Sequence, residues 1–114
     1  MRQTIFAAFL LAATPIIAWA HAKAEQTTPE NEATVKTVEV IEIRFDDPIR
    51  VTAISIIGPD GEVDVERETG MDAVTEFRAL PTAELPVGTY KIDWRGLSAD
   101  GHPVEGSFGF AIAN

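Results

Sequence analysis

An alternation of apolar and polar residues, repeated along the chain, is the sequence feature that most restricts its fold. In residues 39–45, Ile41, Ile43 and Phe45 alternate with charged residues. Successive side chains of a strand point to opposite faces of a sheet, so this spacing predicts a half-buried strand. Segments 89–95 and 106–113 repeat the pattern, and the mature region shows no helical period. These segments predict an all-β domain.

Turn residues divide the rest of the chain into further short strands. Asp46-Asp47-Pro48 should end or bend the first strand, and residues 58–61 should join segments 50–57 and 62–66 into a hairpin. We expect another strand over 73–80. About seven short strands of this kind predict a Greek-key β-barrel or Ig-like β-sandwich. The expected aromatic core comprises Phe45, Trp94, Phe108 and Phe110.

Two stretches should lie outside these strands. Residues 23–37 are polar around Pro29 and predict an extended leader laid on the domain, and residues 96–105 should form the loop between the last two strands.

The N-terminus has the three parts of a secretory signal peptide. Basic Arg2 precedes an apolar run over residues 5–17, and Ala18-Trp19-Ala20 places small residues where a peptidase needs them. The run is short for the alternative, a membrane anchor. We therefore expect residues 1–20 to be removed in the periplasm and residues 21–114 to form one domain, with no membrane insertion after cleavage.

Composition narrows the functions of that domain. The chain has no cysteine, so disulfides and thiolate ligands are excluded. All acidic residues follow the predicted cut while Arg2 precedes it, so a full-chain net charge of −9 becomes −10 in the mature protein. The basic residues are scattered singly, which disfavours nucleic acid as a partner. A cation is the more natural ligand.

The two histidines are the best candidate ligands. Cleavage would make His21 the N-terminus, where the α-amine and ring Nδ1 together can chelate a metal. His102 follows Asp100 by two residues, and in an extended backbone both side chains would project to one side. Nitrogen and oxygen donors suit Cu(II), with Zn(II) as the rival and a solvated turn as the alternative without metal.

Several separated segments resemble the CopC-type periplasmic copper-binding proteins. They are His21-Ala22-Lys23, Thr28-Pro29, Ala33-Thr34-Val35, the strand ending in Phe45, residues 88–95, and Ser98-x-Asp100-x-His102-Pro103-x-x-Gly106-Ser107. The resemblance implies a Greek-key barrel with one Cu(II) ion held by the amine and ring of His21, by Asp100 and by His102. Asp47 stands where the family often has a glutamate, and its shorter side chain leaves direct ligation open.

The resemblance also implies a function in copper tolerance or supply. We expect a monomer that is not an enzyme and that sequesters Cu(II) or delivers it, with an inner-membrane CopD-like copper transporter as a candidate partner. Met71 alone cannot form the methionine-rich Cu(I) site of some members. The alternatives are a metal-free Ig-like interaction module and a small histidine-brace copper oxidase, for which the short turns leave little substrate surface.

Overall fold

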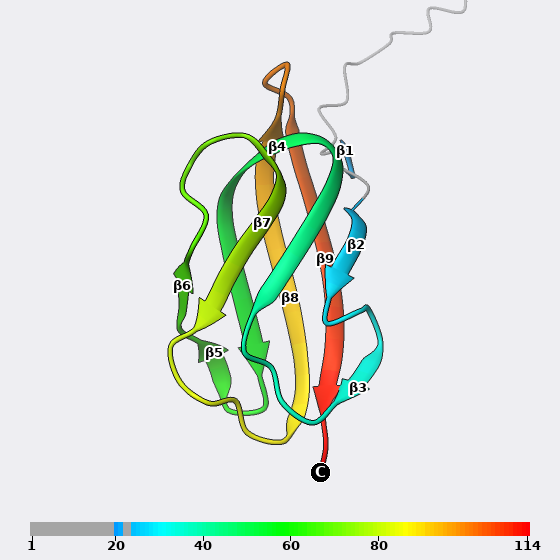
Figure 1. Ribbon diagram of the computed structural model, residues 1–114, viewed down its shortest axis with the longest axis vertical. Helices are drawn as coiled ribbons and strands as arrows, with labels where there is room; N and C mark the ends of the chain where they lie inside the picture. The colour runs from blue at the N-terminus through cyan, green and yellow to red at the C-terminus, as the bar shows by residue number, and fades with distance from the viewer. Residues whose placement is uncertain (1–19, 22–23) are drawn as a thin grey trace, which may run out of the picture.

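A computed structural model describes residues 20–21 and 24–114, all as strands and connecting loops (Figure 1). The predicted signal peptide lies outside this part of the chain except for Ala20. The strands are β1 (Ala20–His21), β2 (Ala24–Thr28), β3 (Ala33–Val35), β4 (Ile41–Gly58), β5 (Gly61–Val63), β6 (Val65–Arg67), β7 (Val74–Pro81), β8 (Gly88–Ser98) and β9 (Pro103–Ile112). Among the described residues, no helix has the length and apolarity to cross a membrane.

Strand β4 belongs to both layers of the domain. Its first half pairs with β2 and β7, and its second half pairs with β5 and β8. Asp46-Asp47-Pro48 bends the strand between the halves without ending it, and Figure 1 shows this arch at one end of the molecule. The single sheet, ordered β1-β9-β8-β4-β7-β6, is thereby folded over on itself. The expected all-β architecture is confirmed.

The core lies between the two layers and contains the predicted aromatic residues. Phe45, Trp94, Phe108 and Phe110 are each at most 6 % exposed. Phe45 meets Trp94 edge to face, with ring centroids 5.0 Å apart, so the two layers contact each other directly. Burial of large aromatic side chains on this scale stabilises a small domain that has no disulfides.

Three details differ from the sequence-based expectation. The leader is partly regular, because β2 pairs with β4 and β3 pairs with β9. The segment 62–66 is divided, because β5 pairs with β4 whereas β6 pairs with β7. The predicted loop 96–105 is much shorter, because β8 and β9 remain paired up to Leu97 and Pro103.

Candidate metal centre

Three segments that carry predicted ligands meet at one end of the domain. They are the tip of the β8–β9 hairpin, the bend of β4 and strand β1 (Figure 1). Ile49, just after the bend, pairs with Ser98 at the start of the tip. On the far side of β9, His21 pairs with Glu105. The fold therefore brings strand β1 and the bend of β4 to the end of the domain where the tip of the β8–β9 hairpin lies.

Backbone hydrogen bonds close the hairpin tip into a tight turn. The Ser98 N–H donates to the His102 carbonyl and the Gly101 N–H donates to the Ser98 carbonyl, each at 2.9 Å. Gly101 has a φ of 84°, a left-handed conformation that favours glycine because it has no Cβ. The turn thus has a fixed shape although it projects into solvent.

Asp100 and His102 meet at this turn. Oδ2 of Asp100 lies 2.8 Å from Nδ1 of His102, and their side chains are 68 % and 74 % exposed. The sequence predicted that the two side chains would lie together, but its reason was wrong. The backbone turns at Gly101 instead of continuing as a strand, so it is the turn that brings them into contact.

Ser98 completes the cluster and was singled out from the sequence only as part of a motif. Its hydroxyl donates to Oδ1 of Asp100 and accepts the His102 backbone N–H at 3.2 Å. The Ser98 hydroxyl first, and then the contacts with His102, lower the pKa of Asp100 below its usual value. A hydrogen bond to an ionised carboxylate favours that form, so the turn presents a negative charge beside an imidazole.

His21 approaches the same hairpin from the other end of the chain. Strand β1 runs parallel to β9, with Ala20 paired to Val104 and His21 paired to Glu105. Glu105 is the third residue after His102. The register concerns backbone positions, because the His21 side chain lies outside what the structure describes.

Asp47 is exposed on the bend of β4 and is not gathered with the pair. Among the described side chains, no group of three or more His, Cys, Asp or Glu residues is close enough to hold a metal ion. A contribution of Asp47 to the metal site stays a prediction. The described donors are thus one imidazole and one carboxylate, which suit Cu(II) or Zn(II) but leave coordination positions for further ligands.

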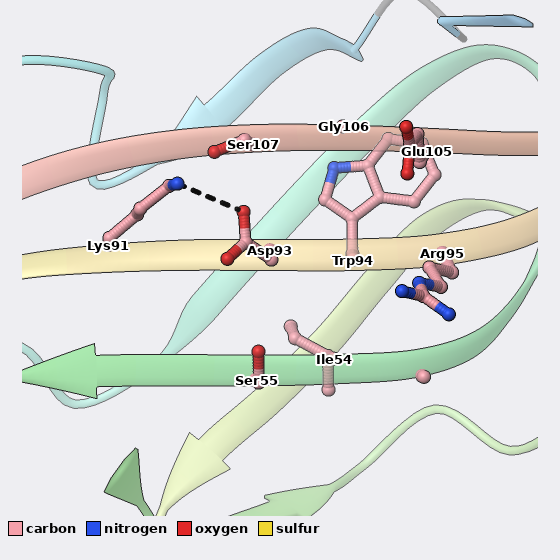
Figure 2. Close-up of a pocket in the computed structure, with 10 residues that line it drawn as sticks. Ile54, Ser55, Lys91, Asp93, Trp94, Arg95, Glu105, Gly106 and Ser107 are labelled. Atoms are coloured by element: carbon pink, nitrogen blue, oxygen red, sulfur yellow. Dashed lines mark ion pairs between the residues drawn. The ribbon is translucent and has the colours of Figure 1, made fainter. Parts of the chain in front are cut away.

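A hollow of about 480 Å³ lies elsewhere, on the outer face of β4, β8 and β9. Figure 2 shows Lys91 and Asp93 pointing toward each other there, with Nζ and Oδ1 3.8 Å apart. Small residues such as Ser55 and Ser107 line it together with side chains of both charges. This hollow contains neither Asp100 nor His102, so we place the candidate metal centre at the hairpin tip.

The sequence profile of the CopC domain matches residues 24–113. Copper resistance protein C of Escherichia coli is 25 % identical over 98 % of this chain and 97 % of its own length. Copper resistance protein C of Pseudomonas syringae pv. tomato is 29 % identical over 96 % of this chain and 92 % of its own length. Copper transport protein CutJ of Bacillus subtilis is 28 % identical over 97 % of this chain but only 21 % of its own length.

Solved structures agree with these matches. PcoC, described as a methionine-rich copper resistance protein from E. coli, superposes with a TM-score of 0.68 at 26 % identity, covering 82 % of this chain and all of that one. CopC from Methylosinus trichosporium OB3b superposes with a TM-score of 0.67 at 29 % identity, covering 81 % of this chain and 93 % of that one.

Proposed function

The chain belongs to the CopC domain family, and on that premise we propose that it binds one Cu(II) ion in the periplasm and sequesters it or passes it on. Its relatives are copper resistance and copper transport proteins, so its function is related to copper. The family consists of copper-binding resistance proteins and not of enzymes, so the copper oxidase alternative has no support.

The proposed ligands are the α-amine and ring of His21, the Asp100 carboxylate and the His102 imidazole. The observation that carries the proposal is the pairing of His21 with Glu105, because it brings the predicted new N-terminus to the strand that begins just after His102. An amine, two imidazoles and a carboxylate form a nitrogen and oxygen donor set, which favours Cu(II) among divalent ions by the Irving–Williams order.

Cleavage after Ala20 is part of the proposal. In the precursor the nitrogen of His21 is an amide, which is a poor ligand, and removal of residues 1–20 turns it into an amine. Such an amine has an ordinary pKa of about 7.7–8.0, so a metal ion competes easily for it at neutral pH. Processing would therefore create a ligand as well as release the protein.

The oxidation state follows from the donors that the chain has. PcoC is described as methionine-rich, whereas this chain contains only Met1 and Met71. Thioether sulfur stabilises Cu(I), and nitrogen and oxygen do so less well. We therefore propose a single Cu(II) site with no separate Cu(I) site, and Asp47 as an acidic group beside it.

The exposure of the hairpin tip suits exchange of the metal. Asp100 and His102 are mostly in solvent, so a partner's ligands can approach without unfolding the domain. A region of the longer copper transport protein CutJ matches nearly all of this chain, which supports delivery to an inner-membrane copper transporter. The protein would act as a monomer in this role.

The experiment that tests this function is a Cu(II) titration of protein that begins at His21, compared with the same protein carrying one extra glycine before His21. We expect the extension to weaken binding at least tenfold and to change the electron paramagnetic resonance (EPR) spectrum, because the amine becomes an amide. Unchanged affinity and spectrum would show that the amine is not a ligand. Mass spectrometry of the exported protein checks the cleavage position separately.

A further inference from the structure

We propose that Ser98 is a positioning residue of the copper site: its hydroxyl holds Asp100 and the backbone of His102 in place before the metal arrives. This inference rests on the proposed function, because it concerns the same ligands. It adds a residue that does not itself touch the metal.

The contacts of one side chain carry the inference. Ser98 Oγ donates to Oδ1 of Asp100 and accepts the N–H of His102 at 3.2 Å. The other carboxylate oxygen, Oδ2, lies 2.8 Å from Nδ1 of His102. A single hydroxyl therefore links the two proposed ligands, by the side chain of Asp100 and by the main chain of His102.

Such a link matters because the ligands are exposed. Side chains in solvent sample several rotamers, and immobilising them on binding lowers affinity. At 68 % and 74 % exposure, Asp100 and His102 are only weakly restricted by packing. A hydrogen bond to an ionised carboxylate is among the stronger kinds, so Ser98 supplies the restraint that packing would supply in a buried site.

The arrangement also selects one nitrogen of His102. A neutral imidazole that donates its Nδ1 proton to a carboxylate has its lone pair on Nε2. In the metal-free protein Nε2 is therefore the available donor. A metal on Nε2 lies on the far side of the ring from Asp100, so Oδ2 would have to leave Nδ1 for Asp100 to ligate the same ion, whereas the bond from Ser98 to Oδ1 can stay. Losing a hydrogen-bond partner that orients a metal ligand typically costs about 10–100-fold in affinity.

Removing the hydroxyl should leave the turn itself intact. The bonds from Ser98 N–H to the His102 carbonyl and from Gly101 N–H to the Ser98 carbonyl use only backbone atoms. The pairing of Ile49 with Ser98 is also a backbone register. Ser98→Ala therefore tests the hydroxyl, and Ser98→Thr, which keeps a hydroxyl, should restore its effect.

The test uses protein that begins at His21, as wild type, Ser98→Ala, Ser98→Thr and Ser107→Ala. Ser107→Ala is the matched control, because Ser107 is an exposed serine on the neighbouring strand β9. Each is titrated with Cu(II) against a competing chelator, its EPR spectrum is recorded, and the ring nitrogen shifts of His102 are measured by NMR without metal.

We expect Ser98→Ala to weaken Cu(II) binding about tenfold, to alter the EPR spectrum and to move the metal-free His102 ring toward a mixture of tautomers. Ser98→Thr and Ser107→Ala should resemble wild type. If wild type binds Cu(II) and Ser98→Ala matches it in affinity, spectrum and ring shifts, this inference is wrong while the proposed function stands. If wild type itself does not bind Cu(II), the proposed function is wrong and the role of Ser98 in it is also lost.

Discussion

Asp100 and His102 contact each other across a glycine in a left-handed conformation: Oδ2 lies 2.8 Å from Nδ1, and Gly101 between them has a φ of 84°. The pairing is therefore a property of the turn and not of a strand face. Because the turn projects from the domain, the chemistry of the pair can be changed without disturbing the core.

The first prediction concerns that separation of binding from stability. Asp100→Asn and His102→Ala should each weaken Cu(II) binding at least tenfold, because each removes a proposed ligand. Both side chains are exposed and lie outside the core, so the loss of stability should be small beside the loss of binding, and thermal unfolding should stay close to that of wild type. Isothermal titration and differential scanning calorimetry measure the two effects.

Asp60→Asn is the matched control for this pair of variants, because Asp60 is an exposed aspartate in the β4–β5 turn at the opposite end (Figure 1). It should bind Cu(II) as wild type does. Equal affinity in Asp60→Asn and Asp100→Asn would contradict the assignment of Asp100.

The second prediction concerns the acid titration of Asp100 in the metal-free protein. Hydrogen bonds from Ser98 and His102 lower its pKa, so its carboxylate should stay ionised below the usual aspartate value of about 3.9. The stability that these bonds contribute is present above that value and is lost as the pH falls through the lower folded-state pKa.

Carboxyl-carbon NMR measures this titration directly. The midpoint for Asp100 should lie below about 3.9, and Ser98→Ala should raise it, because the hydroxyl is the largest cause of the shift. A wild-type midpoint above the usual value would show that the bonds of the turn do not persist in solution.

The third prediction concerns alkaline pH and Tyr90, the only tyrosine. Its side chain is 1 % exposed and its ring stacks on Phe110. Burial first, and then the charge of Asp60, raise its pKa. Above about pH 10 the unfolded chain loses the phenol proton while the folded chain keeps it, so the free energy of unfolding should decrease as the pH rises further.

Urea unfolding between about pH 8 and pH 11 tests this prediction across the titration range of tyrosine. Tyr90→Phe removes the titrating group and should flatten the alkaline decrease. It should also lower stability at neutral pH by about 1 kcal/mol, because the hydrogen bond to the Pro86 carbonyl is lost. An equally steep alkaline decrease in Tyr90→Phe would assign the effect to other groups.

The fourth prediction concerns the close contact between Gly106 and Trp94. A Cβ at position 106 would lie 2.6 Å from three indole atoms, including Nε1. Because the indole is buried and packed against Phe45, it cannot move away freely. Gly106→Ala should therefore destabilise the domain by about 1–3 kcal/mol, measured by urea unfolding.

Gly70→Ala is the control for that substitution, since no atom lies within 4 Å of the position of its Cβ and its φ is not left-handed. Its effect should be close to zero or slightly stabilising. Similar losses in the two variants would mean that the contact with Trp94 does not restrict position 106.

The strands that the sequence predicts well are those with a buried face. Ile41, Ile43 and Phe45 are all buried on one side of β4, as the alternation requires. Strands β2 and β3 were missed because the polar leader carries no such alternation, and its strands depend on hydrogen bonds to β4 and β9 that only the folded domain provides.

In the candidate site, too, the features that a short motif contains were predicted, and those that depend on the fold were not. The residues themselves made Asp100 and His102 candidate ligands, the resemblance to CopC proteins implied the same pair, and the two side chains do meet. The role of Ser98 could not be predicted from spacing alone, because it depends on the turn at Gly101. The pairing of His21 with β9 joins residues that are far apart in the sequence. The sequence around either residue does not predict it.

The pairing of β1 with β9 has a consequence for the order of folding. The hairpin of β8 and β9 consists of contacts between neighbouring segments, which form quickly because little chain must be ordered to close them. His21 and Glu105 pair directly, but almost the whole sequence of the domain lies between them. A contact of such high sequence separation forms late, because a long loop must be closed. The copper site would therefore exist first as the Asp100–His102 half alone, and the arrival of the N-terminal strand would be the step that completes it.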